Sequence, residues 1–336
     1  MKAPAPEYGS DTSGLVWGYL FTPGRAPEPI ECAAALEWLN DAAKPEGFVW
    51  LHFSLSNSRT EPWIRKSLPL AEVFYESLHQ SVGSTRLELD DETLVAVVHD
   101  VMFNSNFDSG NISTLTLCME SRLVVSARLR PLRSVDMLRA SVKAGQALRS
   151  PAELLAELLR NQAAVLAEIV RESTLRVDTI EDSLLANRIS TSRGELSSLR
   201  RSLVRLQRLL APEPAALFRL LNHPPDWLSE EDVGDLRQAA EEFSTTVVDS
   251  AALSERLKLL QEELAAMVNE HSSRTLFLLT LVTVLALPIN VVAGLLGMNV
   301  GGVPLAQHPQ GFFLVVCALT AVTIALAYFF LLRRRD

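Results

Sequence analysis

Residues 276–299 read LFLLTLVTVLALPINVVAGLLGMN, and this stretch decides the architecture of the chain. Residues 276–296 contain no charged side chain, and neither do residues 311–332, GFFLVVCALTAVTIALAYFFLL. As helices, segments of ~21 residues would each span ~30 Å, the thickness of the hydrocarbon core of a bilayer. Because the connection over residues 297–310 is too short to fold alone, the sequence predicts a transmembrane hairpin.

Charge and leader signals indicate on which side of the membrane the rest of the chain lies. Residues 1–14, MKAPAPEYGSDTSG, lack the apolar core of a signal peptide. Arg333, Arg334 and Arg335 follow the second segment, and the positive-inside rule places such a tail in the cytoplasm. We therefore expect both termini to be cytoplasmic and residues 297–310 to face outward.

The formal net charge of −9 is unevenly distributed. Residues 276–336 hold three Arg and one Asp, so the first 275 residues carry −11. This acidity argues against nucleic acid as a partner and suits a cytosolic body that concentrates cations, although an ordinary acidic domain has the same charge. Cys32, Cys118 and Cys317 are too far apart for a zinc-site spacing, so we expect them to pack as small apolar residues.

The first 150 residues have the alternation of a mixed α/β domain. Apolar and β-branched runs predict strands at residues 15–21, 48–53, 94–103, 114–119 and 123–127. Helical patterns occur at residues 31–39 and 71–78, and residues 104–111 form a predicted hairpin turn. The fold class expected for this part is an α+β domain, a mixed α/β sandwich.

Long helices follow this domain. Ser150 is a predicted N-cap before a helix over residues 152–187, and a second helix is expected over residues 194–210. The first is acidic, and the second carries Arg193, Arg200, Arg201, Arg205 and Arg208. We expect an antiparallel hairpin that brings the opposite charges together, a solvated, salt-bridged face being favoured over an anion site for the arginines.

A third helix is predicted from Ser229, which forms a capping box with Asp232, to residue 296. It would run ~100 Å and needs partners along its length, so we expect an oligomer. The domain organisation is then 1–150 for the α/β domain, 151–221 for the helical hairpin, 222–275 for the stalk, 276–296 and 311–332 for the membrane helices, 297–310 for the outer loop and 333–336 for the basic tail.

This arrangement resembles the CorA superfamily of divalent-cation transporters. The resemblance is carried by the long helix that enters the membrane and by Gly297-Met298-Asn299 between the two C-terminal segments. It implies a homopentameric funnel in a bacterial inner membrane, with the first membrane helices forming the pore. The continuation Val-Gly-Gly-Val-Pro over residues 300–304 has no carboxylate and looks like the ZntB branch, which implies zinc as the transported ion.

The resemblance assigns selectivity to Gly297, Met298 and Asn299. Five Asn299 amides would surround the axis and hydrogen-bond the water shell of a hydrated ion, which Mg²⁺ in particular gives up reluctantly. Gly297 would let the backbones approach, and Met298 would pack beside the ring. A helix C-cap is the structural alternative for Asn299 and is compatible with this role.

One face of the first membrane helix is the predicted pore lining. Steps of three and four residues place on it Asn269, Leu276, Thr280, Thr283, Leu287 and Asn290. Polar side chains are costly in lipid, so Thr280, Thr283 and Asn290 should face a cavity or a partner helix, where packing is the alternative role. Leu276 and Leu287 are candidate apolar constrictions.

Charged candidates flank the predicted pore. Glu262, Glu263 and Glu270 would form anionic rings at the inner mouth or be ordinary solvated stalk residues. His271 and His308 are the candidates for proton or metal contacts, since neither membrane segment contains an ionisable residue. The sequence assigns no metal-ligand set.

We therefore predict a transporter of divalent cations, zinc above all, with nickel, cobalt and cadmium ions as further candidates and protons as a candidate coupling ion. Its other partners would be membrane lipid and further copies of the same chain. A magnesium and cobalt channel of the CorA type is the nearest alternative. A membrane-anchored structural or signalling coiled-coil protein is the alternative from another class. No nucleophile triad, phosphate loop or dinucleotide fingerprint points to an enzyme, and no cofactor is expected.

Overall fold

The computed structural model describes residues 11–41, 46–79, 85–102, 112–185, 192–298 and 309–332. It divides into two compact units, Met1–Gln261 and Glu262–Asp336. The boundary falls inside one helix, α8, which runs from Glu230 to Leu296. Each unit is described by itself.

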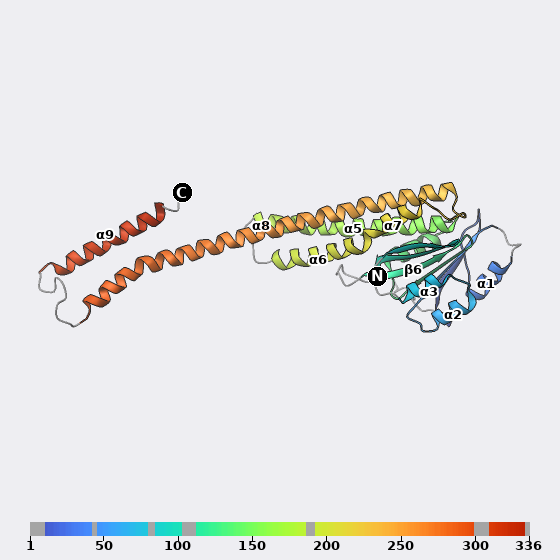
Figure 1. Ribbon diagram of the computed structural model, residues 1–336, viewed down its shortest axis with the longest axis horizontal. Helices are drawn as coiled ribbons and strands as arrows, with labels where there is room; N and C mark the ends of the chain where they lie inside the picture. Colours follow the sequence, from blue (N-terminus) through green and yellow to red (C-terminus); the bar gives the residue numbers. More distant parts are fainter. Residues whose placement is uncertain are drawn as a thin grey trace. The chain divides into compact units, whose positions relative to one another are not determined.

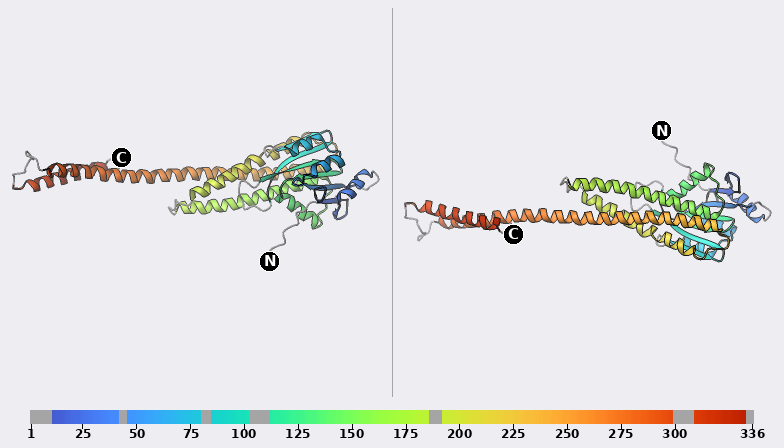
Figure 2. Two further views of the ribbon diagram at one scale, coloured as in Figure 1. Left: turned by 90° about the horizontal axis from the view of Figure 1, so that it is seen from below. Right: turned by 90° about the horizontal axis from the view of Figure 1, so that it is seen from above.

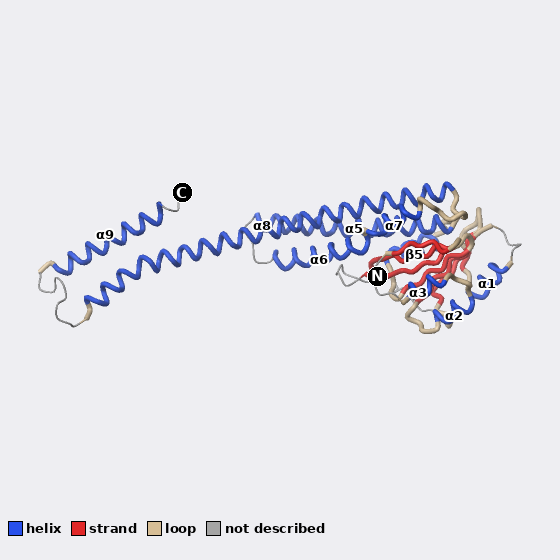
Figure 3. Tube along the Cα trace, viewed as in Figure 1, coloured by secondary structure: helices blue, strands red, loops and turns tan. Residues whose placement is uncertain are grey.

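In the described residues of the first unit, seven strands form one mixed sheet in the order β2-β1-β3-β7-β6-β5-β4. Figure 3 draws the strands in red. β3 and β7 pair in parallel, whereas β5 and β6 form an antiparallel hairpin. The predicted turn at residues 104–111 lies outside the described residues. The strands are β1 Leu15–Phe21, β2 Glu28–Pro29, β3 Phe48–Ser54, β4 Arg86–Asp90, β5 Thr93–Val101, β6 Ile112–Met119 and β7 Leu123–Arg128.

Helices cover both faces of the sheet, as Figure 1 shows. α1 (Cys32–Asn40), α2 (Thr60–Ser67) and α3 (Glu72–Leu78) pack on one face, where Ile64 and Phe74 are fully buried. A separate apolar core on the other face is formed with α4 (Arg133–Lys143) and the long helices. Two cores on opposite faces of one sheet confirm the predicted α+β sandwich.

The long helices are α5 (Pro151–Leu185), α6 (Ser192–Leu210), α7 (Pro212–Leu220) and the first part of α8. Both views of Figure 2 show α5 and α6 running antiparallel, and Pro212 begins α7 as a first-turn proline. The sequence patterns did not predict α2, α4, β2 and β4. The first two are short helices rich in polar residues, and the two strands lie at the edges of the sheet, where few apolar residues are needed.

The second unit contains the C-terminal part of α8 and α9 (Gly311–Leu332). Both helices are long and apolar enough to cross a membrane, and the apolar window of each is unburied. Leu276 is 63% exposed and Phe312 is 79% exposed. An apolar surface of this extent requires lipid or a partner chain to cover it. The two segments predicted to cross a membrane are therefore present as helices of sufficient length and apolarity.

A buried polar cluster ties the sheet to the helices in the first unit. Glu213 of α7 accepts a hydrogen bond from the backbone N–H of His99 at 2.6 Å, and Gln162 of α5 donates to the His99 carbonyl at 2.8 Å. Beside it, the Asp100 carboxylate accepts bonds from the N–H and the hydroxyl of Ser134, at 2.8 Å and 2.6 Å. All five residues are buried, so the bonds named here replace bonds that the same atoms would make to water in the unfolded chain.

Burial dominates the electrostatics of this cluster. It raises the pKa of Asp100 to about 7, although the bonds from Ser134 and Val101 favour the charged carboxylate. Burial also raises the pKa of Glu213 above its usual range, against the bonds from His99. Loss of solvation therefore outweighs the hydrogen bonds at both carboxyls.

This shift gives a pH-dependent prediction. Because the pKa of Asp100 is about 7 when folded and ~3.9 in an unfolded chain, the folded state alone holds the proton between those values, and stability falls as pH rises. Replacing Asp100 by Asn should remove this loss, so the variant gains roughly 1 kcal/mol per pH unit relative to wild type between about pH 4 and pH 7.

The measurement is chemical unfolding of the full chain in detergent, followed by tryptophan fluorescence. All five tryptophans precede residue 262, so the signal reports the first unit. Asp90→Asn, at an exposed position on β4, is the matched control and should follow the wild-type pH profile. An Asp100→Asn profile parallel to that of the wild type would contradict this interpretation.

Candidate functional site: a polar stripe on the membrane part of α8

The six predicted pore-lining residues lie on one face of α8. In a regular helix a step of seven residues changes the direction of a side chain by only ~20°, so Asn269, Leu276, Thr283 and Asn290 are nearly in line. On the same face, Thr280 lies one turn after Leu276 and Leu287 lies one turn after Thr283. The side chains of all six are exposed in the chain. Ser273 is also exposed and shares this face, four residues after Asn269; the spacing that identified the others also identifies it.

The two threonines on this stripe satisfy their hydroxyl protons inside the helix. Thr280 donates to the carbonyl of Leu276 and Thr283 to that of Leu279, both at 2.8 Å. Each hydroxyl oxygen therefore keeps lone pairs directed away from the helix. Such a threonine needs no partner helix to satisfy its proton, and it offers an acceptor to water. Thr320 and Thr323 on the last helix of the chain, residues 311–332, make the same bond, so this geometry is compatible with a hydrated path and also with a packed helix face.

The helix ends at the Gly-Met-Asn motif. The N–H of Gly297 donates to the carbonyl of Ala293 at 2.9 Å, and that of Met298 to Leu295 at 3.4 Å. A Cβ at Gly297 would lie 3.1 Å from the Ala293 carbonyl oxygen, so a larger residue there would require a small local shift. Met298 is exposed. Asn299 and His308 lie outside the described residues, so their predicted roles stay predictions.

The inner-mouth candidates do not share one face. Glu262 lies seven residues before Asn269 and continues the stripe, whereas Glu263 and Glu270 are rotated by ~100° and His271 by ~200°. All four are exposed. Glu270 lies 3.9 Å from Arg274, a pair in a solvated position that contributes little. Helix geometry therefore favours Glu262 among these candidates.

Metal-binding side chains are not gathered elsewhere: within the ranges that the structure describes, no three His, Cys, Asp or Glu side chains form a metal site. Cys32 and Cys118 are buried, as predicted, and burial raises the pKa of the Cys118 thiol to about 12. His52 accepts a bond from Arg128 at 2.8 Å, and burial and that guanidinium lower its pKa well below the usual range. These side chains serve the packing of the domain.

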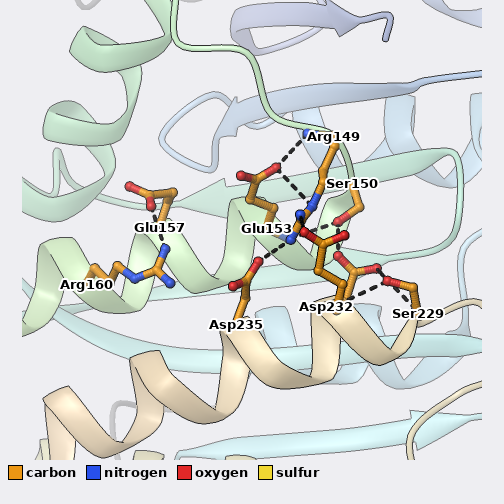
Figure 4. Close-up of polar contacts among 9 residues, drawn as sticks. Arg149, Ser150, Glu153, Glu157, Arg160, Ser229, Asp232 and Asp235 are labelled. Atoms are coloured by element: carbon orange, nitrogen blue, oxygen red, sulfur yellow. Dashed lines mark hydrogen bonds and ion pairs between the residues drawn. The ribbon is translucent and has the colours of Figure 1, made fainter.

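The start of α8 is fixed to the start of α5, as Figure 4 shows. The predicted capping box forms: Ser229 Oγ accepts from the Asp232 N–H at 3.1 Å, and Asp232 accepts from the Ser229 N–H at 3.2 Å. The Ser150 hydroxyl donates to the other Asp232 oxygen at 2.5 Å. Its oxygen also accepts a hydrogen bond from the Glu153 N–H and so caps the start of α5. Arg149 bonds Glu231 and Asp235 on α8. Buried Asp232 thus links the two helix ends.

The expected pairing of α5 acids with α6 arginines is wrong. Asp178 and Glu181 of α5 both bind Arg256 of α8, and Glu168 binds Arg133 of α4. Among the side chains that the structure describes, no ion pair joins α5 to α6. The apolar stripes of the two helices decide their rotation, and that rotation directs the acids elsewhere.

Comparisons with known proteins find relatives over most of the chain. The family model of the CorA-like Mg2+ transporter protein matches residues 45–334. The divalent cation transporter CmaX of Pseudomonas aeruginosa is 28% identical over 316 residues, 93% of this chain and 94% of that one. The zinc transport protein ZntB of Yersinia enterocolitica is 24% identical over 280 residues, 83% and 85% of the two chains.

Solved structures show the same fold over nearly the whole chain. The structure of full-length CmaX matches with a TM-score of 0.79 at 26% identity, covering 98% of this chain and all of that one. The CorA magnesium transporter of Methanocaldococcus jannaschii matches with a TM-score of 0.74 at 17% identity, covering 93% and 96%. With a family model that spans residues 45–334 and a fold shared from end to end, this chain belongs to the CorA-like Mg2+ transporter protein family.

Proposed function

We propose that this protein transports divalent cations across a membrane through a pore lined by the polar stripe of α8. The observation that carries the proposal is the exposed row from Asn269 to Asn290 on a helix otherwise suited to lipid. Polar side chains at this depth are costly unless they face water or protein. Membership of a transporter family and the name of the relative CmaX support the same function.

The pore needs several copies, because one helix encloses no path. We propose a homopentamer with a cytosolic funnel, formed by the α8 helices around an axis in a bacterial inner membrane, with both termini cytoplasmic. The exposed apolar surface of α8 and α9 supports burial against lipid and neighbouring copies. Light scattering of the detergent-solubilised protein should give the mass of five chains, and a transport-competent monomer would contradict this assembly.

Selection is proposed to occur at Asn299, just beyond the end of α8. Five amide groups would hydrogen-bond the water of a hydrated cation without removing it, so the ring senses the size and field of the hydrated ion. Along the stripe, Thr280, Thr283 and Asn290 would offer oxygens to the hydrated ion, and Leu276 and Leu287 would narrow the path. Glu262 would attract cations at the inner mouth.

Zinc is the proposed principal cargo, with nickel, cobalt and cadmium as further candidates. The connection over residues 297–310 contains no carboxylate, so no ring of fixed negative charge can hold a hard cation there. The names of the relatives agree with a divalent cation and include zinc for ZntB and magnesium for CorA. A magnesium and cobalt channel is the runner-up. We propose that this protein is not an enzyme and that it uses no cofactor.

The first prediction of this proposal concerns Asn299. Purified protein in liposomes should take up zinc, and Asn299→Ala should reduce uptake by at least about tenfold, because the ring loses all of its amides at once. Asn161→Ala, on α5 in the first unit, is a control. It removes an amide that is far from Asn299 in the sequence, and it should leave uptake nearly unchanged. Uptake by Asn299→Ala at the wild-type rate, at equal abundance, would mean that Asn299 only caps the helix.

Absence of uptake of every divalent cation by the intact wild-type protein would instead favour a membrane-anchored structural or signalling role.

The second prediction concerns ion preference. In competitive uptake at equal free concentrations zinc should exceed magnesium, because the outer connection lacks the carboxylates that hold hard cations. The assay is repeated with the membrane potential clamped and with an imposed pH gradient. A dependence on the gradient would support coupling to protons. Preference for magnesium would overturn the zinc assignment and leave cation transport in place.

A further inference from the structure

A basic groove lies between α6 and α8 within the first unit. It has a volume of about 540 Å³, which falls in the range of small-ligand sites. Its lining includes Ser197, Arg200, Arg201, Arg205, Arg208 and Gln261. Four guanidinium groups thus line one concavity of a chain whose net charge is −9.

Three of these arginines have no acidic partner among the residues that the structure describes. Arg201, Arg205 and Arg208 make no ion pair or side-chain hydrogen bond with any residue that the structure describes. The nearby α5 acids Asp178 and Glu181 are engaged by Arg256 instead. Within the part of the chain that the structure describes, no acidic side chain neutralises these three guanidinium groups.

The spacing of the arginines costs the helix stability. Arg201 and Arg205 are four residues apart and Arg205 and Arg208 are three apart, so each pair holds like charges as neighbours on the helix surface. The fourth arginine is held in place: Arg200 donates to the Gln261 side chain at 2.7 Å, and Gln261 lies 3.5 Å from the Ser197 hydroxyl. A bound anion would offset the repulsion between these arginines. Arg200 would contact it from the edge of the groove, where Gln261 already holds its side chain.

We propose that the α6 groove binds a small anion with two or more phosphate groups. Guanidinium groups bind phosphate oxygens in pairs, and a row of them at helical spacing suits several linked phosphates better than one small ion. The site lies in the first unit, and its existence does not depend on the ion that the pore carries.

The test is calorimetric titration of the full chain, in nanodiscs of neutral phosphatidylcholine, with inorganic triphosphate and without divalent cations. Wild type should bind, and the triple variant Arg201→Gln, Arg205→Gln, Arg208→Gln should bind at least about tenfold more weakly. A matched control removes three exposed arginines outside the groove: Arg171→Gln, Arg176→Gln and Arg237→Gln. It should keep the wild-type affinity within about twofold, since distant exposed charges are screened by salt.

Thermal unfolding distinguishes a ligand site from a structural role. Glutamine keeps the helix propensity and removes the like-charge repulsion, so the groove variant should unfold at the same temperature as wild type or higher without anion. Triphosphate should raise the unfolding temperature of wild type and leave that of the groove variant unchanged. A groove variant that unfolds at a lower temperature without anion would indicate that the arginines stabilise the fold.

Three further results would overturn the proposal. Wild type that binds no triphosphate has no such site. Equal weakening in the groove and control variants would mean that binding follows net charge alone. Loss of assembly in the groove variant, with no triphosphate binding by wild type, would make this face an interface between copies.

The same titration in nanodiscs of anionic phosphatidylglycerol identifies the source of the phosphate. Unchanged triphosphate affinity assigns the groove to a dissolved anion. Affinity that falls more for wild type than for the Arg171, Arg176 and Arg237 control variant means that lipid headgroups with a single phosphate compete for the same arginines, and this result would overturn the assignment to an anion with two or more phosphates. An equal fall in both proteins would follow from the negative surface charge of the discs and would leave that assignment in place.

Discussion

One part of the helix α8 belongs to a folded unit in water and the other part is suited to lipid, and most of the structure follows from that constraint. Its first part, to Gln261, belongs to the compact unit that contains the sheet, where Leu236 and Phe243 are fully buried. Its last part is apolar and unburied. In lipid every backbone polar group needs an internal partner, so an unbroken helix is the form this segment can take, even through Pro288. The polar stripe departs from the apolar composition of this segment, and burial in lipid does not explain it, so it requires a functional role.

The hydrogen bonds of the threonines explain which polar groups the stripe exposes. Thr280 and Thr283 keep their protons inside the helix and turn lone pairs outward. In the proposed assembly such oxygens would repeat around an axis and make a path that is polar and uncharged, which a hydrated divalent cation would follow without binding too tightly to leave. The acidic side chains of α8 lie before the membrane segment, where Glu262 continues the stripe. Cation attraction and cation passage are thus assigned to different residues.

The sequence predicted those features that arise within one element. Uncharged runs of sufficient length specify the membrane helices, and runs of apolar, β-branched and aromatic residues specify β1, β3 and β5 to β7. It did not predict α4, because Val135, Leu138 and Val142 are a short apolar stripe among polar residues. Nor did it predict that Arg256 would bind Asp178 and Glu181, since that contact depends on how three helices pack. The buried Asp100 and Glu213 cluster likewise joins residues far apart in sequence.

The central claim is that the stripe of α8 faces the ion path, and thiol accessibility tests it most directly. In a Cys317→Ser background, cysteine is placed at Thr280 or Thr283 on the stripe, or at Leu278 or Leu285 on the opposite face. Cys32 and Cys118 are buried, so the introduced thiol is the reactive one. Silver ions bind thiolates and are small enough to follow a cation path. We predict that silver blocks divalent-cation uptake by the Thr280→Cys and Thr283→Cys proteins and spares Leu278→Cys and Leu285→Cys. Block of the Leu278 and Leu285 variants alone would contradict the claim.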